Sequence, residues 1–309
     1  MSSEYAIEVE GLQKTFGNVQ VLKQVDFKVK KGTIFSLLGS NGAGKTTTIK
    51  ILTTLMRRDK GRVEICGYDV EQDAHKVRES ISLTGQFAAV DEMLTGYENL
   101  VMTVRFHHLR DAKLRARELL EYFDLEAAAH RKVSTYSGGM RRKLDIAMSL
   151  VNAPAVLFLD EPTTGLDPMS KRMLWNTIQE LKRQGTTIFL TTQYLEEAEE
   201  LSDHIAILDK GKILVEGRLE ELKKLLPYGM LEFTFAKELD LDRALASVSD
   251  YPHVIEDRDN VKMSVRIERS EDIITLFQLF TSMHIKIQEF SSKSPTLEDI
   301  FLSLVGKGV

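Results

Sequence analysis

The chain has 309 residues, 43% hydrophobic and 28% charged, a composition typical of a globular protein with about two domains. Its net charge is −5, and neither residues 227–309 nor the rest of the chain is basic, which argues against a nucleic-acid-binding protein. The longest uninterrupted apolar run is five residues, at 155–159, so no membrane-spanning helix is expected. The short basic clusters at 57–58 and 141–143 are interpreted as solvated or phosphate-proximal charges.

The first 226 residues alternate apolar runs with amphipathic stretches, which predicts an α/β fold with a parallel sheet covered on both faces. Strands buried on both faces are near-continuously hydrophobic. The strand candidates are 33–38, 155–159, 186–190 and 204–208. The segments 111–125 and 171–183 repeat apolar residues at helical spacing and are predicted as helices.

A domain boundary is predicted after residue 226, where Pro227 and Gly229 interrupt a helical pattern. Residues 227–309 carry 9 basic and 14 acidic side chains, and their periodicity differs from that of the first part. The order of elements reads β-α-β-β-α-β, a small α+β domain. The predicted strands lie near 231–235, 253–255, 261–267 and 285–287, the helices at 241–248 and 270–283, and a last helix at 296–305.

The sequence GSNGAGKT at 39–46 fits G-x-x-x-x-G-K-[ST] and lies between a predicted strand and a predicted helix, the context of a P-loop. Backbone N–H groups of such a loop face phosphates, and the following helix adds its positive end. Lys45 is expected to reach the β- and γ-phosphates of a nucleotide, and the Thr46 hydroxyl to bind Mg²⁺. The predicted phosphate-binding residues are Gly39, Ser40, Asn41, Gly42, Ala43, Gly44, Lys45, Thr46 and Thr47.

The apolar run at 156–159 ends in Asp160 and Glu161, acids placed where α/β sheets bind ligands. Asp160 is expected to hold Mg²⁺, and Glu161 to orient and polarise the attacking water. An acidic pair before Pro162 is also compatible with a helix N-cap, but together with Lys45 the pair favours catalysis.

A turn of small residues, YSGGM at 136–140, opens a predicted helix and leaves N–H groups free for an anion. Because the chain already has a P-loop, this turn is expected to bind the γ-phosphate held by a second subunit. A structural capping turn is the alternative. Ser137, Gly138 and Gly139 are the candidate contacts.

These motifs resemble the ATP-binding subunits of ATP-binding cassette (ABC) transporters, over residues 4–222. The resemblance implies a P-loop NTPase cassette with a RecA-like core and a helical subdomain at about 87–150, binding ATP and Mg²⁺. It places Phe16 where an aromatic ring stacks on adenine, although packing at a strand edge is an equal alternative. It also implies that Gln86 contacts Mg²⁺ and the water in a Q-loop, and that Asp167, in GLDP at 165–168, crosses the dimer interface. An exposed loop glutamine and a simple turn are the alternatives at these two positions.

At the switch position, where the family has a histidine, this chain has Gln193. An amide can donate a hydrogen bond to the γ-phosphate, but it carries no charge and shuttles no proton. Glu161 is therefore the main candidate for the base, and Gln193 is expected to act by positioning.

The segments 84–91, 135–142, 191–198 and 295–301 are similar to the daunorubicin-resistance type of bacterial drug-export ATPase. That resemblance implies a homodimer of ATP-binding subunits, in the cytoplasm against the inner face of the membrane through a separate permease, exporting a hydrophobic compound. Phe87 and Leu94 are the expected permease contacts. The C-terminal domain is expected to support dimerisation or regulation. The alternative function is an ABC-type ATPase that acts on nucleic acid or ribosomes without transport.

Overall fold

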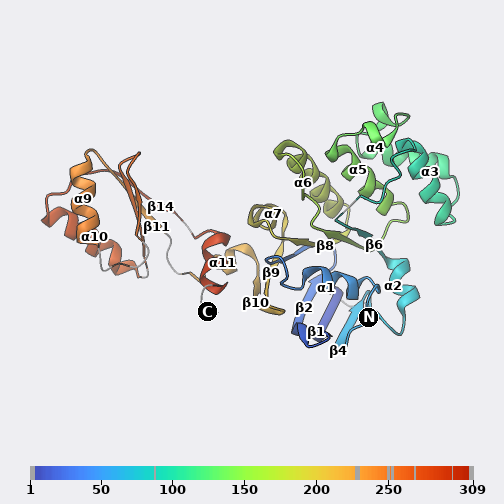
Figure 1. Cartoon of the computed structure of the whole chain (residues 1–309), viewed down its shortest axis with the longest axis horizontal. Helices are drawn as coiled ribbons and strands as arrows, with labels where there is room; N and C mark the ends of the chain where they lie inside the picture. Colours follow the sequence, from blue (N-terminus) through green and yellow to red (C-terminus); the bar gives the residue numbers. More distant parts are fainter. Residues whose placement is uncertain are drawn as a thin grey trace. The chain divides into compact units, whose positions relative to one another are not determined.

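The computed structural model describes residues 4–86, 88–226, 230–248, 251, 254–267, 269–293 and 295–305. The chain divides into two compact units, Met1–Arg218 and Leu219–Val309 (Figure 1). The boundary predicted from the sequence lies after residue 226, eight residues beyond this division. Within the described residues, no helix is both long and apolar enough to span a bilayer.

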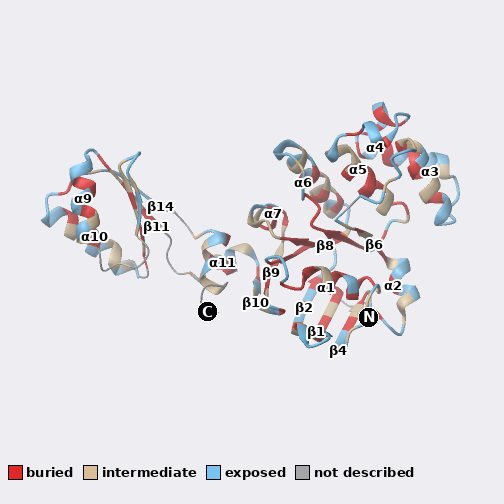
Figure 2. Cartoon of the chain, in the orientation of Figure 1, coloured by how far each residue is buried: buried red, intermediate tan, exposed pale blue. Residues whose placement is uncertain are grey.

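The first unit is built on a six-stranded sheet of order β10-β9-β3-β8-β7-β6. Its strands are β3 (Ile34–Leu38), β6 (Ile81–Thr84), β7 (Val156–Asp160), β8 (Thr187–Thr192), β9 (His204–Asp209) and β10 (Lys212–Gly217). All neighbouring pairs are parallel except β9 and β10. Every residue of β3, β7 and β8 is buried (Figure 2). The prediction of a buried parallel sheet is confirmed.

A second, antiparallel sheet of order β2-β1-β4-β5 was not predicted from the sequence. It comprises β1 (Tyr5–Phe16), β2 (Val19–Lys30), β4 (Lys60–Ile65) and β5 (Tyr68–Asp69). Helix α1 (Lys45–Leu52) lies between the two sheets (Figure 1). The rings of Phe27, Phe35 and Phe189 stack with centroids 5.2 to 5.7 Å apart, which joins β2 to β3 and β8. Ile49, Ile51 and Leu52 of α1 belong to the same apolar core, which packs α1 against both sheets.

The opposite face of the parallel sheet is covered by helices. They are α3 (Gly96–Phe106), α4 (Ala112–Tyr122), α5 (Gly138–Ser149), α6 (Pro168–Arg183) and α7 (Leu195–Leu201), with α2 (Ala74–Ser80) leading into β6 and short 3-10 turns at Glu126–Ala128 and Val133–Thr135. Helices α3, α4 and α5 gather at one end of the unit (Figure 1). Their buried side chains form one apolar core with those of α6 and one face of β7 and β8. The predicted helices at 111–125 and 171–183 are therefore present as α4 and α6.

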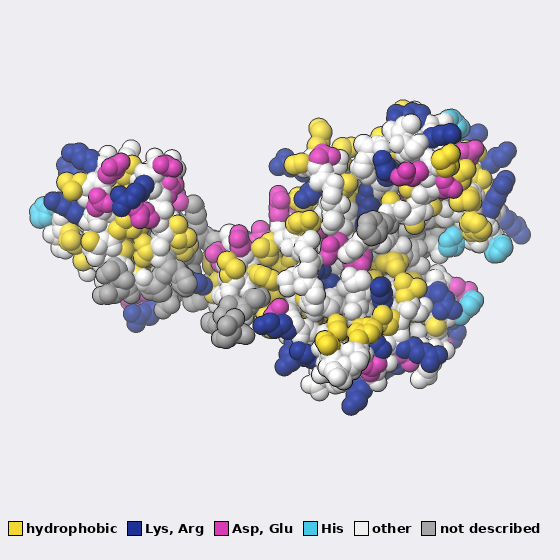
Figure 3. Space-filling view, viewed as in Figure 1, with side chains coloured by type: hydrophobic (Ala, Val, Ile, Leu, Met, Phe, Trp, Pro, Cys, Tyr) yellow, Lys and Arg dark blue, Asp and Glu magenta, His cyan; other side chains and the backbone are white. Residues whose placement is uncertain are grey.

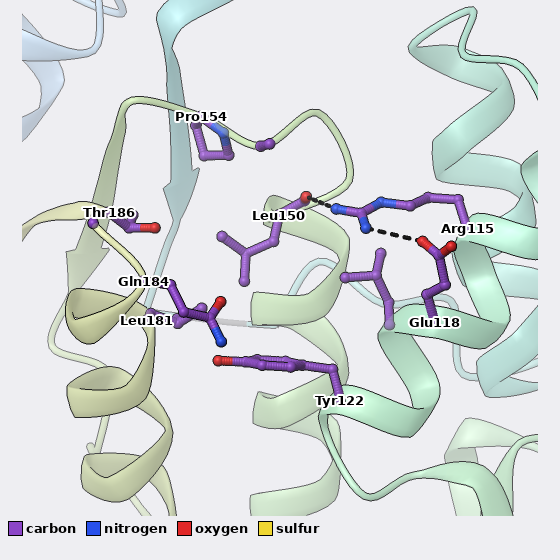
Figure 4. A pocket seen from close by; sticks show the side chains of 11 residues that line it. Arg115, Glu118, Tyr122, Leu150, Pro154, Leu181, Gln184 and Thr186 are labelled. Carbon is purple, nitrogen blue, oxygen red and sulfur yellow. Dashed lines mark hydrogen bonds and ion pairs between the residues drawn. The ribbon is translucent and has the colours of Figure 1, made fainter.

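One side chain ties α4 to the C-terminal end of α5. The Arg115 guanidinium donates to the carbonyls of Leu150, at 3.1 Å, and Val151, at 3.4 Å, and pairs with Glu118 at 3.2 Å (Figure 4). Both carbonyls directly follow α5, and that of Leu150 also accepts from the Ala153 N–H at 3.1 Å. A cation at this place complements the negative end of the helix dipole. The residues around Arg115 line a cavity of about 430 Å³ that contains none of the predicted nucleotide-binding residues.

Arg115→Met is therefore expected to lower the free energy of unfolding by roughly 1 kcal/mol, because the carbonyls of Leu150 and Val151 lose the guanidinium hydrogen bonds while the aliphatic stem remains. Chemical denaturation of the full chain measures this. Lys113→Met, on the exposed face of the same helix, is the matched control and should change stability much less. Equal stability of the two variants would contradict the capping role of Arg115.

In the second unit the predicted β-α-β-β-α-β order is present. The elements are β11 (Met230–Phe235), α9 (Glu238–Ser247), β12 (Val254–Asp257), β13 (Lys262–Arg266), α10 (Ser270–Ser282) and β14 (Ile287–Lys293), flanked by α8 (Leu219–Lys223) and α11 (Leu297–Val305). The strands form an antiparallel sheet of order β12-β13-β11-β14. Phe233, Phe235 and Phe280 fill its core. His253, the first residue of one predicted strand, lies outside the described residues.

Candidate nucleotide-binding site

The loop at 39–46 connects β3 to α1 in a conformation that requires glycine at two positions. Gly44 has a φ of 115°, and a Cβ atom there would lie 2.7 Å from the side chain of Leu22. A Cβ atom on Gly39 would collide with the carbonyl oxygen of Leu208. The Gly39 N–H donates to the carbonyl of Thr192 at 3.1 Å, which ties the start of the loop to the end of β8. The predicted strand–loop–helix context of a P-loop is present.

Lys45, the first residue of α1, lies beneath this loop with only 4% of its surface exposed. Its Nζ donates to the carbonyl oxygens of Gly39, at 2.7 Å, and Ser40, at 3.1 Å. The same nitrogen lies 3.2 Å from Oε1 of Glu161. The fold thus brings the predicted phosphate-binding cation and the predicted base into direct contact, although they are far apart in the sequence.

The acidic end of β7 is held by the neighbouring strand β8. Thr191 Oγ1 donates to Asp160 Oδ1 at 2.5 Å, and the Glu161 N–H donates to the Thr191 carbonyl at 3.1 Å. Asp160 and Thr191 are opposite each other in the parallel register. Glu161 adopts a φ of 48°, a strained conformation for a residue with a side chain, which is common at functional sites. Thr191 was not predicted as a site residue, because its role depends on which strand lies beside β7.

The candidate Mg²⁺ ligands are oxygen atoms of Thr46, Asp160 and Gln86. Mg²⁺ binds oxygen ligands and is often held by one or two carboxylates together with substrate phosphates. Asp160 is 6% exposed and supplies a carboxylate at the end of β7, while Thr46 is half-buried in the first turn of α1. This donor set fits Mg²⁺ bound together with a nucleotide. Gln86 is exposed and follows β6, the strand next to β7.

Gln193 directly follows β8 and is half-buried. Its neighbour Thr192 is bonded to the start of the P-loop, so Gln193 lies at the same edge of the sheet as the phosphate-binding loop.

If Gln193 donates to the γ-phosphate as predicted, Gln193→Ala should reduce the kcat of ATP hydrolysis roughly tenfold, because that donor is lost. Steady-state ATPase kinetics measure the change. Gln193→His, which restores a ring N–H donor, should recover part of the rate. Full activity of the alanine variant would show that Gln193 does not position the phosphate.

The turn at 136–140 forms the N-terminus of α5. Ser137 caps the helix by accepting from the Met140 N–H at 3.3 Å. A Cβ atom on Gly139 would lie 2.7 Å from Ser170 Oγ in α6, so the turn packs closely against that helix. Among the described residues, no hydrogen bond joins residues 137–139 to the P-loop of the same chain.

Asp167 caps α6, beside this turn. Its carboxylate accepts from the Ser170 hydroxyl at 2.6 Å and from the backbone N–H groups of Met169 and Ser170. These bonds lower the pKa of Asp167 and keep it ionised. In the structure Asp167 caps a helix, and its role at a dimer interface stays a prediction.

Phe16, the last residue of β1, exposes 45% of its surface, and the Lys14 ammonium lies 5.5 Å from its ring centroid. The ring is open for stacking, and its contact with adenine stays a prediction. The interpretation of residues 141–143 as solvated charges is wrong for two of them, because Arg142 and Lys143 are 5% and 8% exposed, and the phosphate-proximal alternative stays a prediction.

The glycine-dependent loop, the buried lysine and the acidic strand end define a P-loop nucleoside triphosphatase. Residues 22–164 match the ABC transporter family model, and residues 217–305 match the C-terminal domain of DrrA1-3-like ATP-binding proteins. The chain is 42% identical to the daunorubicin resistance ATP-binding protein DrrA2 of Streptomyces coeruleorubidus, over 98% of this chain and 95% of that protein. It therefore belongs to the ABC transporter ATP-binding proteins of the daunorubicin-resistance group, and it is an ABC-type ATPase.

Two further comparisons agree with this family. The chain is 42% identical to the Nod factor export ATP-binding protein I of Ralstonia nicotianae, over 70% of this chain and 68% of that protein. It is also similar to the solved dimeric structure of an ATP-binding cassette in a post-hydrolysis state, bound to ADP and Pi. The TM-score is 0.62, with 26% identity over 69% of this chain and 98% of that one.

Proposed function

We propose that two copies of this chain bind and hydrolyse ATP with Mg²⁺ at a shared interface and so drive export of a hydrophobic, drug-like compound through a separate membrane permease. The observation that carries the proposal is the 42% identity to a daunorubicin resistance protein over 98% of the chain, which includes the second unit. The alternative, an ABC-type ATPase acting on nucleic acid or ribosomes, is not favoured. Both signs of charge are interspersed on the face seen in Figure 3.

At the P-loop, the Lys45 ammonium donates to the triphosphate in place of the carbonyls of Gly39 and Ser40, because charged oxygens are stronger hydrogen-bond acceptors. Mg²⁺, held by Thr46, Gln86 and Asp160, neutralises phosphate charge when bound. Glu161 then accepts a proton from the attacking water, and Gln193 donates to the γ-phosphate. The contact between Lys45 and Glu161 supports this scheme, because it puts the base beside the phosphate-binding cation.

The turn at 137–139 completes the site of the partner copy. The absence of a bond from this turn to its own P-loop, among the described residues, leaves its N–H groups free for the γ-phosphate of the partner's ATP. ATP then favours the closed dimer, since a ligand shifts an equilibrium by its differential affinity. Hydrolysis removes the phosphate that both copies bind. The solved relative bound to ADP and Pi is also dimeric.

The surface around α3 is the proposed contact with the permease, on the cytoplasmic face of the membrane. Met93 and Phe106 expose 70% and 73% of their surfaces there. Leu94, which follows Met93 in the sequence, is half-buried. Phe87, the other expected contact, lies outside the described residues.

For residues 227–309 we propose support of dimerisation or regulation.

The test is co-expression of this chain with the polytopic membrane protein encoded by a neighbouring reading frame. We expect the two to co-purify, vanadate-sensitive ATPase activity in lipid, and outward transport of an anthracycline-like fluorescent compound. Glu161→Gln in the same complex is the control that should stop transport. Recovery of the chain with ribosomes or nucleic acid, instead of with the membrane protein, would overturn the proposal.

A further inference from the structure

A buried ion pair on α5 lies outside the motifs assigned above. Arg142 and Asp145 are one helical turn apart, with Nη1 and Oδ2 at 3.2 Å, and their side chains are 6% and 5% exposed. Burial lowers the pKa of Arg142 and raises that of Asp145, but their mutual attraction opposes both changes. A buried ion pair is stable only when further hydrogen bonds satisfy both charged groups. Here backbone groups of two other segments supply these hydrogen bonds.

The first segment is the Q-loop, which the pair holds on both sides of Gln86. Arg142 Nη1 donates to the carbonyl of Gly85 at 2.6 Å. On the other side, the Ala89 N–H donates to Asp145 Oδ1 at 3.0 Å. Gln86 is itself exposed, so its position relative to the core depends on these two anchors.

The second segment follows the candidate base. Arg142 Nε donates to the carbonyl of Pro162 at 2.9 Å, one residue after Glu161. One planar guanidinium therefore links residue 85, before Gln86, to residue 162, after Glu161, and attaches both to the helix that begins at Gly138. Among the described residues, the remaining nitrogen, Nη2, is buried and has no hydrogen-bond partner, so the bonds of Nε and Nη1 hold the guanidinium at this place.

We propose that Arg142 is a positioning residue for ATP hydrolysis: together with Asp145, it sets the place of Gln86 relative to Glu161 and moves both with α5. The inference rests on the proposed roles of Gln86 and Glu161. A displacement of about 1 Å in a reacting group can cost on the order of 100-fold in rate. A lysine at 142 keeps the positive charge beside Asp145. Its single ammonium cannot reproduce the planar guanidinium that donates to the carbonyls of Gly85 and Pro162 at once.

The test compares Arg142→Lys with Arg58→Lys in the purified full chain. Arg58 is a matched control, because it also pairs with an aspartate, Asp69 of β5 at 2.8 Å, and donates to a carbonyl, that of Gly61 in β4. For Arg142→Lys we expect kcat to fall roughly 10- to 100-fold, with the ATP dissociation constant within about threefold and Tm within a few degrees. Arg58→Lys should keep kcat within about twofold. A normal kcat in Arg142→Lys, or an equal loss in Arg58→Lys, would overturn the inference.

A double-mutant cycle separates positioning from a general loss of structure. If Arg142 acts through the Q-loop, Arg142→Lys should cost little further kcat in a Gln86→Ala background, and effects that multiply would overturn the inference. If Arg142→Lys unfolds, the double variant Arg142→Met with Asp145→Leu removes both buried charges and should fold with the same loss of kcat. Glu161→Gln distinguishes a failure of the proposed catalytic role of Glu161 from a failure of the positioning role of Arg142. Turnover that survives in Glu161→Gln contradicts the proposed role of Glu161 as the base, on which the inference rests, whereas normal turnover in Arg142→Lys beside an inactive Glu161→Gln contradicts the positioning role of Arg142 alone.

Discussion

Glu161→Gln is expected to reduce ATP turnover at least ~100-fold while ATP binding is retained. The carboxylate proposed to accept the water proton is replaced by an amide of the same shape, which can still contact Lys45 through its oxygen. Because the nucleotide then stays intact, ATP should hold two copies together. Phosphate release measures turnover, and size-exclusion chromatography coupled to light scattering, with ATP and Mg²⁺, measures the dimer.

Two controls accompany this experiment. Glu180→Gln, a half-buried carboxylate on α6, should leave turnover within about twofold, and EDTA should abolish the activity of the unaltered chain by removing Mg²⁺. A Glu161→Gln variant that remains monomeric at saturating ATP would argue against a site shared between two copies. Undiminished hydrolysis would instead exclude Glu161 as the base.

Lys45→Met is expected to raise the dissociation constant for ATP on the order of 100-fold, because it removes the buried ammonium that we propose binds the β- and γ-phosphates. Methionine preserves most of the volume of the lysine stem, so packing under the P-loop should be kept. Titration with a fluorescent ATP analogue measures the affinity.

Lys50→Met, on the exposed face of the same helix, is the matched control and should bind ATP normally. Since Lys45→Met leaves Glu161 buried without its cation, Tm is measured beside affinity to separate weakened binding from unfolding. A folded Lys45→Met variant with unchanged affinity would contradict the phosphate-binding assignment.

The fold was predictable where hydrophobic patterning is unambiguous. Strands β3, β7, β8 and β9 are short apolar runs, and their place in a parallel sheet follows from that pattern. The antiparallel sheet was missed because β1 and β2 mix buried and exposed positions, with register shifts that break strict alternation. The order of elements in the second unit was predicted correctly, because its strands alternate more regularly.

For the site, the sequence by itself determined the P-loop and the acidic strand end, since each is a contiguous motif whose chemistry depends on neighbouring residues. The tertiary structure alone decided that Lys45 meets Glu161 and that Thr191 holds Asp160. It also turned Arg142, which the sequence placed in a basic cluster, into a buried link between two loops. Such contacts depend on which strands and helices become neighbours, and burial then makes each one strong, because water no longer competes for the same hydrogen bonds and charges.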